Sequence, residues 1–408
     1  MSLNQVKRSV TAEVSRTGGL KSPRVLVLGG SRLQVPAIER ARSGGFRVGV
    51  VDRDPKAPGM RLGDDAFVVS TNDSEAVGEL ALRYRPVGVL TVGTDRPMRS
   101  VARATALLGL PGPGEHSVIR STDKWEMSRA FHAASVPAPR SVVVGSSGEV
   151  TSGPALRGRL IVKPVDSSGS RGVRLVDSWG RVGFAVDEAL VHSPSGRVIV
   201  QEYVVGREVS VEGLCVDGRV HIFAATDKLT TGTPHFVELG HSQPAGVSST
   251  ELRDLQQLTV RAVAALGLNS CGIHAEMMIT SNGPVMIELG PRLGGDFITS
   301  HLVPLSTGVD PVDAVVRLAT GQDIELAPKW SRGSAVRFLD GPVASEQRAH
   351  LLARAREVPG VIEAMVDRTE SGTIRSSGDR FGYVISAGAT AADAVASAEH
   401  AVSILLDR

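Results

Sequence analysis

Two glutamates that flank a short turn constrain this chain more than any other feature. Glu276 precedes the apolar run 277–279, and Glu288 follows the apolar run 285–287. Each run predicts a β-strand, and residues 281–284 between them are typical of a turn. Such a hairpin holds the two carboxylates side by side, where they repel each other unless a cation lies between them. We therefore expect a cation site, and Mg²⁺ suits it because Mg²⁺ takes hard oxygen ligands and usually binds substrate phosphates as well.

Length and composition exclude several classes of protein. The 408 residues correspond to two or three domains at roughly 100–200 residues each. Basic and acidic residues nearly cancel, 45 against 43, and form no basic cluster, so we expect no nucleic-acid partner. No apolar run approaches the ~20 residues that span a membrane, so we expect a cytoplasmic protein with no membrane partner. Cys215 and Cys271 match no metal or redox spacing and are predicted to be buried thiols.

The N-terminal part of the chain begins with a βαβ pattern. A buried-strand run at 24–30 is followed by a helical stretch at 34–43 and by a second strand at 46–51. A further strand at 87–92 predicts a small doubly wound domain. The turn after the first strand lacks the second and third glycines of the dinucleotide fingerprint, so we do not expect a nicotinamide site, although Asp52 stands at the right distance.

Lysine is scarce enough to be informative. Only seven of the 45 basic residues are lysines, and Lys124 follows Ser121, Thr122 and Asp123 at the predicted start of a helix. A serine or threonine N-cap and free N–H groups favour an anion at such a position. An ordinary cap with a surface lysine explains the same residues.

A second lysine precedes a loop of small residues. Lys163 lies in the strand run 160–165, and the loop that follows contains Ser167, Ser168 and Gly169. Backbone amides of such a loop can approach phosphates closely because no bulky side chain intervenes. A plain hairpin turn remains the alternative, and no Walker A motif occurs in the chain.

A third motif has the groups that bind a nucleoside. The strand run 198–202 ends in Glu202, and a short hinge with Tyr203 and Val204 leads to a second strand that carries Glu208. Adenine requires an acceptor for its amino group and a backbone donor for a ring nitrogen, and ribose requires an acceptor for its hydroxyls. Glu202, the backbone of Val204 and Glu208 meet these requirements.

In their order and spacing, these motifs together resemble the ATP-grasp superfamily of carboxylate–amine ligases. The resemblance covers about residues 120–320, and the flanking regions match as well. It implies an α/β fold with a doubly wound N-terminal domain, a central two-lobed ATP-grasp domain and a C-terminal lid. The expected divisions are a flexible arm (1–22), the N-terminal domain (23–118), the small lobe (119–205), the large lobe (206–324) and the lid (325–408).

The resemblance also implies roles for the motif residues. Lys124 and Lys163 are expected to hold ATP phosphates, and the loop 166–172 is expected to close over the γ-phosphate. Glu202, Val204 and Glu208 are expected to hold adenosine. Glu276 and Glu288 are expected to hold Mg²⁺, with two ions in all. The chain departs from the family at Gly290, where many members have an asparagine that ligates metal.

A segment at 225–244 resembles the L-amino-acid ligases, which are dipeptide synthetases, and carnosine-synthase-like enzymes. By this resemblance Lys228, Glu238 and His241 line the substrate pocket, with His274 near them. Arg292 is expected to bind the substrate carboxylate and later the oxyanion. Glu238 or His274 is a candidate base for the amine. Single histidines are often structural, and the proline and glycine content also fits a mobile loop.

These resemblances predict an ATP- and Mg²⁺-dependent ligase that joins an amino acid, or a similar carboxylic acid, to an amine through an acyl phosphate. Secondary-metabolite assembly and a homodimer are consistent with this branch. Another ATP-grasp enzyme, such as a purine-pathway ligase or a biotin-carboxylase-like carboxylase, is the first alternative. A non-catalytic nucleotide-binding protein is the second, and the intact Lys163, Glu276, Glu288 and Arg292 argue against it.

Overall fold

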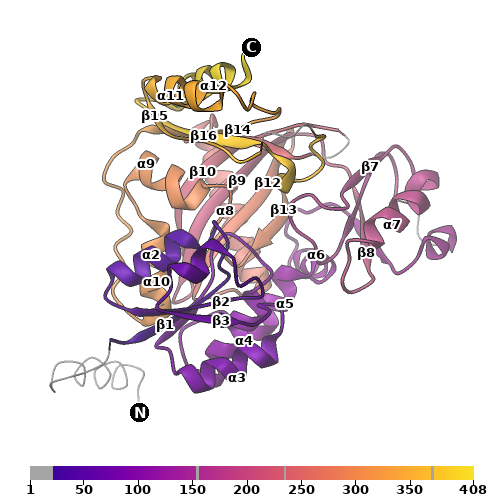
Figure 1. Cartoon of the computed structure of the whole chain (residues 1–408). Coiled ribbons are helices and arrows are strands. Elements are labelled where there is room, and N and C mark those ends of the chain that lie inside the picture. The colour runs from indigo at the N-terminus through magenta and orange to yellow at the C-terminus, as the bar shows by residue number, and fades with distance from the viewer. Residues whose placement is uncertain (1–21, 153–155, 234–235, 369–371) are drawn as a thin grey trace.

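The computed structural model describes residues 22–152, 156–233, 236–368 and 372–408 (Figure 1). The predicted arm, except for Ser22, lies outside these ranges, as do Pro234 and His235 of the predicted substrate segment. The chain has the predicted α/β fold, and the strands that the structure describes form three sheets. No helix within the described ranges is long and apolar enough to cross a membrane.

The N-terminal domain is a four-stranded parallel sheet with the strand order β3-β2-β1-β4. Strands β1, β2 and β4 are almost wholly buried, because helices cover both faces of a parallel sheet. The elements are β1 (Arg24–Leu28), α2 (Val35–Ser43), β2 (Arg47–Asp52), η1 (Pro58–Arg61), β3 (Asp65–Val68), α3 (Ser74–Tyr84), β4 (Gly88–Leu90), α4 (Met98–Leu108) and α5 (Glu115–Thr122).

The turn after β1 is filled by the domain's own side chains. Asp52 Oδ2 accepts a hydrogen bond from the Gly30 amide at 2.7 Å, and Gln34 Nε2 donates to the Val92 carbonyl at 2.7 Å. A Cβ atom on Gly29 would lie 2.9 Å from the Gln34 side chain. The groups that a dinucleotide site offers to its ligand are therefore engaged within this domain.

The small lobe is a four-stranded antiparallel sheet with the order β5-β8-β6-β7. Helix α7 packs on this sheet through a buried aliphatic core. In Figure 1 the lobe projects to the right of the remaining molecule. Its elements are α6 (Lys124–Ala133), β5 (Ser141–Val144), η2 (Ser147–Ser152), β6 (Leu160–Pro164), β7 (Arg174–Val176), η3 (Trp179–Arg181), α7 (Val182–Leu190) and β8 (Val198–Glu202).

The helix at Lys124 begins differently from the prediction. Ser121 and Thr122 end α5, and their hydroxyls donate to carbonyls of that helix. Asp123 is the N-cap of α6, and its carboxylate accepts from the amides of Trp125 and Glu126 at 3.0 and 3.1 Å. The prediction of a serine or threonine cap is therefore wrong. The Ser121 and Thr122 hydroxyls are engaged within α5, whereas the Asp123 carboxylate faces the first amides of α6 and its negative charge is favourable at that helix end.

One eight-stranded sheet joins the large lobe to the C-terminal region, with the order β13-β12-β9-β10-β11-β14-β16-β15. Strand β11 pairs with β14, which places Gln243 opposite Ser334. The strands are β9 (Arg207–Val216), β10 (Arg219–Thr230), β11 (Glu238–Gln243), β12 (Cys271–Thr280), β13 (Gly283–Gly290), β14 (Gly333–Phe338), β15 (Val361–Val366) and β16 (Gly382–Gly388). The expected lid region thus continues the central sheet, and its role as a lid stays a prediction.

Helices cover both parts of this sheet. Buried residues of α8 pack with β9, β12 and β13 in one apolar core, while α11 and α12 form a second core with β15 and β16. The C-terminal helices lie at the top of Figure 1. The helices are α8 (Ser249–Leu266), the π-helix η4 (Ile298–Leu302), α9 (Val303–Thr307), α10 (Pro311–Thr320), α11 (Arg348–Glu357), η5 (Ser377–Asp379) and α12 (Ala391–Leu406).

The hairpin has the predicted register. Glu276 lies directly opposite Glu288, and a bulge follows between Glu276 and Met277. The turn is shorter than predicted, because only residues 281–282 separate the two strands. Both predicted cysteine thiols are free and buried.

The cap of α12 gives a test of the C-terminal packing. Thr390 Oγ1 accepts from the Asp393 amide at 3.2 Å, and Asp393 Oδ2 accepts from the Thr390 amide at 2.9 Å. We expect Thr390→Ala to lower the free energy of unfolding by about 1 kcal/mol, measured by urea denaturation. Thr390→Ser retains the hydroxyl and serves as the control. Equal unfolding midpoints for the alanine variant and the native chain would contradict this prediction.

Candidate active site

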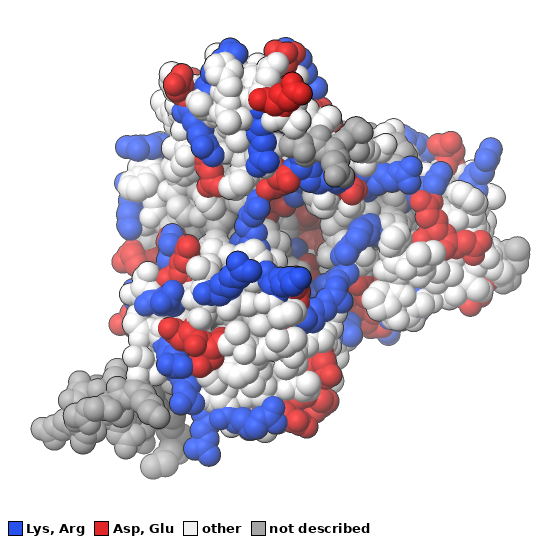
Figure 2. All heavy atoms as spheres, viewed as in Figure 1, with Lys and Arg blue, Asp and Glu red and all other residues white. Residues whose placement is uncertain are grey.

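All the predicted site residues line one cavity of about 650 Å³. It lies where the N-terminal domain, the small lobe and the eight-stranded sheet meet. Figure 2 shows a hollow at this junction, with acidic side chains inside it and basic side chains around its rim. The predicted residues that line the cavity are Lys124, Lys163, Ser167, Ser168, Gly169, Glu202, Tyr203, Val204, Glu208, Lys228, Glu238, His241, His274, Glu276, Glu288 and Arg292.

Each glutamate of the hairpin is paired with a lysine. Lys228 Nζ lies 2.9 Å from Glu276 Oε1, and Lys124 Nζ lies 3.0 Å from Glu288 Oε1. Burial raises the pKa of Glu276, but the charges of Lys228 and His274 outweigh burial and hold this pKa well below its usual range. Two carboxylates thus stand side by side, and each is paired with a lysine from another element.

The two carboxylates are suitable ligands for Mg²⁺, since hard cations prefer oxygen. No group of three or more acidic, histidine or cysteine side chains suited to a metal occurs in the part of the chain that the structure describes. A metal at Glu276 and Glu288 therefore needs further ligands from a bound phosphate or from water. This is the usual situation for Mg²⁺ in nucleotide sites.

A steric contact explains why position 290 is occupied by glycine. A Cβ atom on Gly290 would lie 2.7 Å from Asp95 Oδ1. Asp95, which follows β4 in the N-terminal domain, thus occupies the space that a larger side chain at position 290 needs. Sequence reasoning missed Asp95 as a site residue, although its place after a buried strand is typical of site residues in doubly wound domains.

Asp95 is also the partner of Arg292. Arg292 Nε and Nη2 donate to its two carboxylate oxygens at 3.0 and 2.8 Å. Burial raises the pKa of Asp95, but the arginine outweighs burial and leaves that pKa lowered. Arg292 lines the cavity as predicted, but its guanidinium already holds a carboxylate of the chain. An anion at this position must therefore share the arginine with Asp95.

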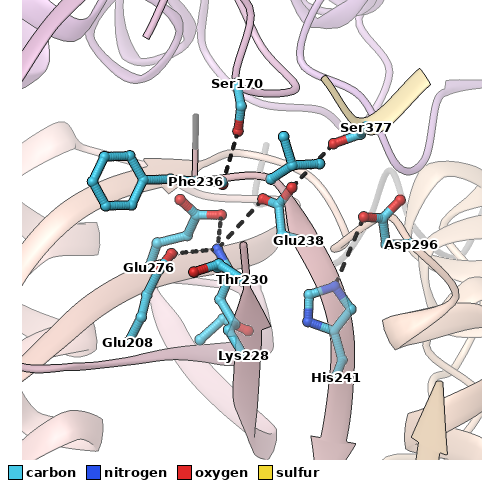
Figure 3. A network of polar contacts seen from close by, with 12 residues as sticks. Ser170, Glu208, Lys228, Thr230, Phe236, Glu238, His241, Glu276, Asp296 and Ser377 are labelled. Atoms are coloured by element: carbon cyan, nitrogen blue, oxygen red, sulfur yellow. Dashed lines mark hydrogen bonds and ion pairs between the residues drawn. The ribbon is translucent and has the colours of Figure 1, made fainter. Parts of the chain in front are cut away.

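Lys228 connects three acidic residues (Figure 3). Its ammonium lies 2.6 Å from Glu208 Oε1 and 3.7 Å from Glu238 Oε1, in addition to Glu276. Its side chain is 3% exposed. Burial lowers the pKa of Lys228, but the three carboxylates together raise it well above its usual value. This lysine therefore contacts one residue of each predicted position. Glu208 belongs to the ribose position, Glu276 to the metal position and Glu238 to the substrate position.

The surroundings of Lys163 shift its pKa in the opposite direction from that of Lys228. It is buried, it lines the cavity, and burial lowers the pKa of its ammonium. Within the described ranges no carboxylate lies within salt-bridge distance of it. Lys124 is close by, and its Nζ donates to the Ser167 carbonyl of the small-residue loop at 2.8 Å. A buried ammonium without an anionic partner favours a bound anion in the cavity.

The hinge between β8 and β9 borders the same cavity. Arg140 donates to the Glu202 carboxylate in a bidentate pair, so an adenine amino group would share that acceptor with Arg140. The Tyr203 ring lies 4.7 Å from the Arg159 guanidinium and 6.0 Å from the Phe236 ring. These aromatic rings provide a flat apolar surface beside the hinge.

His274 is held by carboxylates on both ring nitrogens. Its Nδ1 lies 2.9 Å from Glu212 Oε1, and its Nε2 lies 3.2 Å from Glu276 Oε1. Burial lowers the pKa of His274, but the fully buried Glu212 outweighs burial and raises it to about 9. The ring is therefore protonated at neutral pH, where it orients Glu276 and has no free nitrogen to accept a proton.

The remaining part of the cavity includes residues from the C-terminal region. Glu238 accepts a hydrogen bond from Ser377 Oγ at 3.0 Å (Figure 3). Arg380 donates to both oxygens of Asp296 at 2.7 Å, and His241 Nε2 lies 3.7 Å from Asp296 Oδ2. Ser377 and Arg380 carry no signal in their local sequence, and only the fold brings them to this site.

Two family models match the chain. Residues 121–296 match the ATP-grasp domain, and residues 347–405 match the L-amino acid ligase C-terminal domain 2. Together these ranges take in more than half of the chain. The first match contains the lysines, the hinge and the hairpin, and the second contains Ser377 and Arg380.

Two individual proteins and one solved structure are similar to the chain. An uncharacterized protein, y4rH, from Sinorhizobium fredii is 28% identical over 78% of this chain and 68% of its own length. Dapdiamide A synthase from Enterobacter agglomerans is 30% identical over one third (33%) of each chain. The crystal structure of L-amino acid ligase from Bacillus licheniformis has the same fold, with a TM-score of 0.79, 19% identity and coverage of 94% of this chain and 98% of that one. The chain therefore contains an ATP-grasp domain and a C-terminal domain of the L-amino acid ligase type, and it is an ATP-dependent carboxylate–amine ligase.

Proposed function

We propose that the cavity activates an amino acid, or a similar small carboxylic acid, with ATP and joins it to an amine. The observation that carries this proposal is the charge arrangement of one cavity. Two paired carboxylates suited to Mg²⁺ face Lys163, a buried ammonium with no carboxylate partner in the described ranges. The match of residues 347–405 to the L-amino acid ligases favours an amino acid over the substrates of a purine-pathway ligase or a carboxylase.

ATP is assigned to the side of the cavity that borders the small lobe. In this proposal Lys124 and Lys163 hold its phosphates, and the loop with Ser167, Ser168 and Gly169 covers the γ-phosphate. The hydrogen bond from Lys124 to the Ser167 carbonyl supports this assignment, because it couples the lysine to the loop. Glu202, Tyr203, Val204 and Glu208 are assigned to adenosine, since all four line the cavity and lie at or beside the hinge between β8 and β9.

Glu276 and Glu288 are assigned to Mg²⁺, with two ions expected. When bound, the metal neutralises charge on the phosphates and so favours phosphoryl transfer. The residues of the chain prepare that site. Lys228 and His274 keep Glu276 ionised and oriented, and Lys124 forms an ion pair with Glu288.

The proposed reaction has two steps. An oxygen of the acid attacks the γ-phosphorus, the bond from phosphorus to ADP breaks, and an acyl phosphate forms. The amine nitrogen then attacks the acyl carbon, phosphate leaves, and the nitrogen gives up a proton. Arg292, held in place by Asp95, is assigned to the acid carboxylate and to the oxyanion of the second step.

Glu238 is assigned as the base that takes the proton of the amine. It lines the cavity, it accepts a hydrogen bond from Ser377, and its Oε1 lies 3.7 Å from Lys228 Nζ. His274 is not assigned to this role, because its raised pKa leaves it charged at neutral pH. Both substrates are small molecules in this proposal. A homodimer, a cytoplasmic location and a role in secondary metabolism stay predictions.

The proposal is tested by release of ADP and phosphate from ATP and Mg²⁺ over pairs of amino acids and small acids, with detection of product masses. We expect release that depends on a pair and a product whose mass is the sum of the two minus water. Glu288→Ala is expected to reduce the rate at least about a hundredfold, because it removes a metal ligand. Lys329→Ala, outside the cavity, is the control. Full activity of the Glu288 variant would contradict the metal assignment.

The base assignment predicts a loss specific to the second step. We expect Glu238→Gln to lower the rate of product formation at saturating amine by about a hundredfold, since an amide cannot accept the proton. The KM for ATP is expected to change little, which separates this effect from a general disturbance of Lys228. Unchanged product formation at saturating amine would exclude Glu238 as the base.

The charge of His274 predicts a dependence of stability on pH. The pKa of His274 in the folded chain is about 9, above its ordinary 6.5. Its stabilising contribution, on the order of 3 kcal/mol, is therefore present below the ordinary value and is lost as the pH rises through about 9. We expect the difference in melting temperature between the native chain and His274→Gln to be largest at about pH 6 and to shrink by about pH 10. A difference that is constant across this range would contradict a charged His274.

A further inference from the structure

One arginine of the C-terminal region, Arg380, connects three segments of the cavity wall. Its Nη1 and Nη2 donate to the two carboxylate oxygens of Asp296, each at 2.7 Å. Nη1 also donates to the Glu238 carbonyl at 3.3 Å, and Nε donates to the Ser377 carbonyl at 2.8 Å. All three partners line the main cavity, whereas Arg380 is not part of its described lining. None of the roles proposed above uses this arginine.

The Arg380 side chain is held in one orientation. It is 11% exposed, and its guanidinium carbon lies 3.6 Å from the centre of the Phe338 ring. Phe338 ends strand β14 and is itself buried. A planar guanidinium can stack on a ring and at the same time donate in a fork to a carboxylate, which an ammonium cannot do. The contacts at this position therefore use properties that are specific to arginine.

The first partner, Asp296, is both strained and buried. Its backbone is left-handed, with φ of 49°, and such strain persists at functional sites where the surrounding structure supports it. Burial raises the pKa of Asp296, but the hydrogen bonds and the charge of Arg380 outweigh burial and hold this pKa well below its usual range. Arg380 thus fixes a charged carboxylate in the wall of the cavity.

The second partner, Glu238, is held both at its backbone and at its carboxylate. Arg380 donates to its carbonyl, and Ser377 Oγ donates to its Oε2 at 3.0 Å. Figure 3 shows Ser377 directed at this carboxylate. The turn that carries both donors is closed by Asp379, whose Oδ2 accepts from the Ser376 amide at 2.8 Å. The C-terminal region therefore contributes to the direction in which the Glu238 carboxylate points.

We propose that Arg380 is a positioning residue for the second step of the reaction, and that it holds Asp296 and, directly and through Ser377, Glu238. The inference rests on the proposed ligase reaction and on the assignment of Glu238 as its base. In that step the amine nitrogen bonds to the acyl carbon, phosphate leaves, and the proton of the nitrogen passes to the Glu238 carboxylate. A base is effective only within hydrogen-bond reach of the proton, so a displacement of about 1 Å slows this transfer strongly.

The test compares two nucleophiles that differ in their need for a base. Hydroxylamine is mostly unprotonated at neutral pH and converts the acyl phosphate to a hydroxamate, so it reports the first step. The amine of an amino acid is mostly protonated and depends on the base. The native chain is compared with Arg380→Ala, with the acid and the amine found in the pairwise screen. Arg348→Ala is the matched control, because Arg348 also connects elements of the C-terminal region, through the Val366 carbonyl at 2.9 Å, and lies outside the cavity.

In Arg380→Ala we expect the ratio of amide formation to hydroxamate formation to fall by at least about tenfold. The loss is expected in kcat at saturating amine, with the KM for ATP near its native value. Guanidinium ion at millimolar concentration is expected to restore part of the amide rate in this variant, because it can occupy the vacated place on the Phe338 ring. In Arg348→Ala the ratio is expected to stay native and not to respond to guanidinium.

A native ratio in a folded Arg380→Ala would overturn the inference. An equal loss of both products would also overturn it, because such a loss indicates a general effect on the fold. A native ratio in Glu238→Gln would exclude positioning through Glu238. Absence of both products from the native chain would instead contradict the proposed ligase reaction.

A second variant covers the case in which Arg380→Ala does not fold. Ser377→Ala removes the hydroxyl that donates to Glu238 and leaves the ion pair of Arg380 with Asp296 in place. We expect it to lower the same ratio by about threefold, and we expect Ser377→Thr, which retains the hydroxyl, to recover most of the loss. Circular dichroism of each variant verifies its fold. A native ratio in a folded Ser377→Ala would contradict the inference as well.

Discussion

The geometry of the candidate active site depends on two lysines that neutralise the paired glutamates of the β12–β13 hairpin. Glu276 and Glu288 stand opposite each other, and like charges in this position destabilise a sheet. Lys228 comes from β10 and Lys124 from the start of α6, so neither belongs to the hairpin. The repulsion between the two glutamates is therefore relieved only after the sheet and the small lobe have packed around the hairpin. This packing also places the proposed phosphate-binding lysines beside the proposed metal ligands in one cavity.

Two further ion pairs fix the loop that follows the hairpin. Asp95 of the N-terminal domain holds Arg292, and Arg380 of the C-terminal region holds Asp296. Gly290 is part of this arrangement, because its missing side chain leaves the space that Asp95 occupies. Buried ion pairs contribute little net stability, since the loss of hydration offsets their attraction. Their effect is to orient the loop after the hairpin. They connect this loop to the N-terminal domain through Asp95 and to the C-terminal region through Arg380.

The same loop forms part of the wall between two cavities. Its strained residues, Asp296 and Phe297, line different spaces, and Gly295 forms the border with Gly93.

The sequence by itself determined the α/β fold and the hairpin with its opposed glutamates, because apolar periodicity reports burial and turn residues report chain reversal. Lys228, Glu238 and His241 were expected at the cavity only from the resemblance to the L-amino-acid ligases, and Asp95 and Ser377 were missed. The prediction failed at the cap of α6, where Asp123 competes with Ser121 and Thr122 within the same few residues. Only the tertiary structure decided the partners: Asp95 for Arg292, Ser377 for Glu238 and Arg380 for Asp296. An ion pair depends on distances of a few ångströms between domains, and those distances are set by how whole sheets and helices pack, which no local pattern contains.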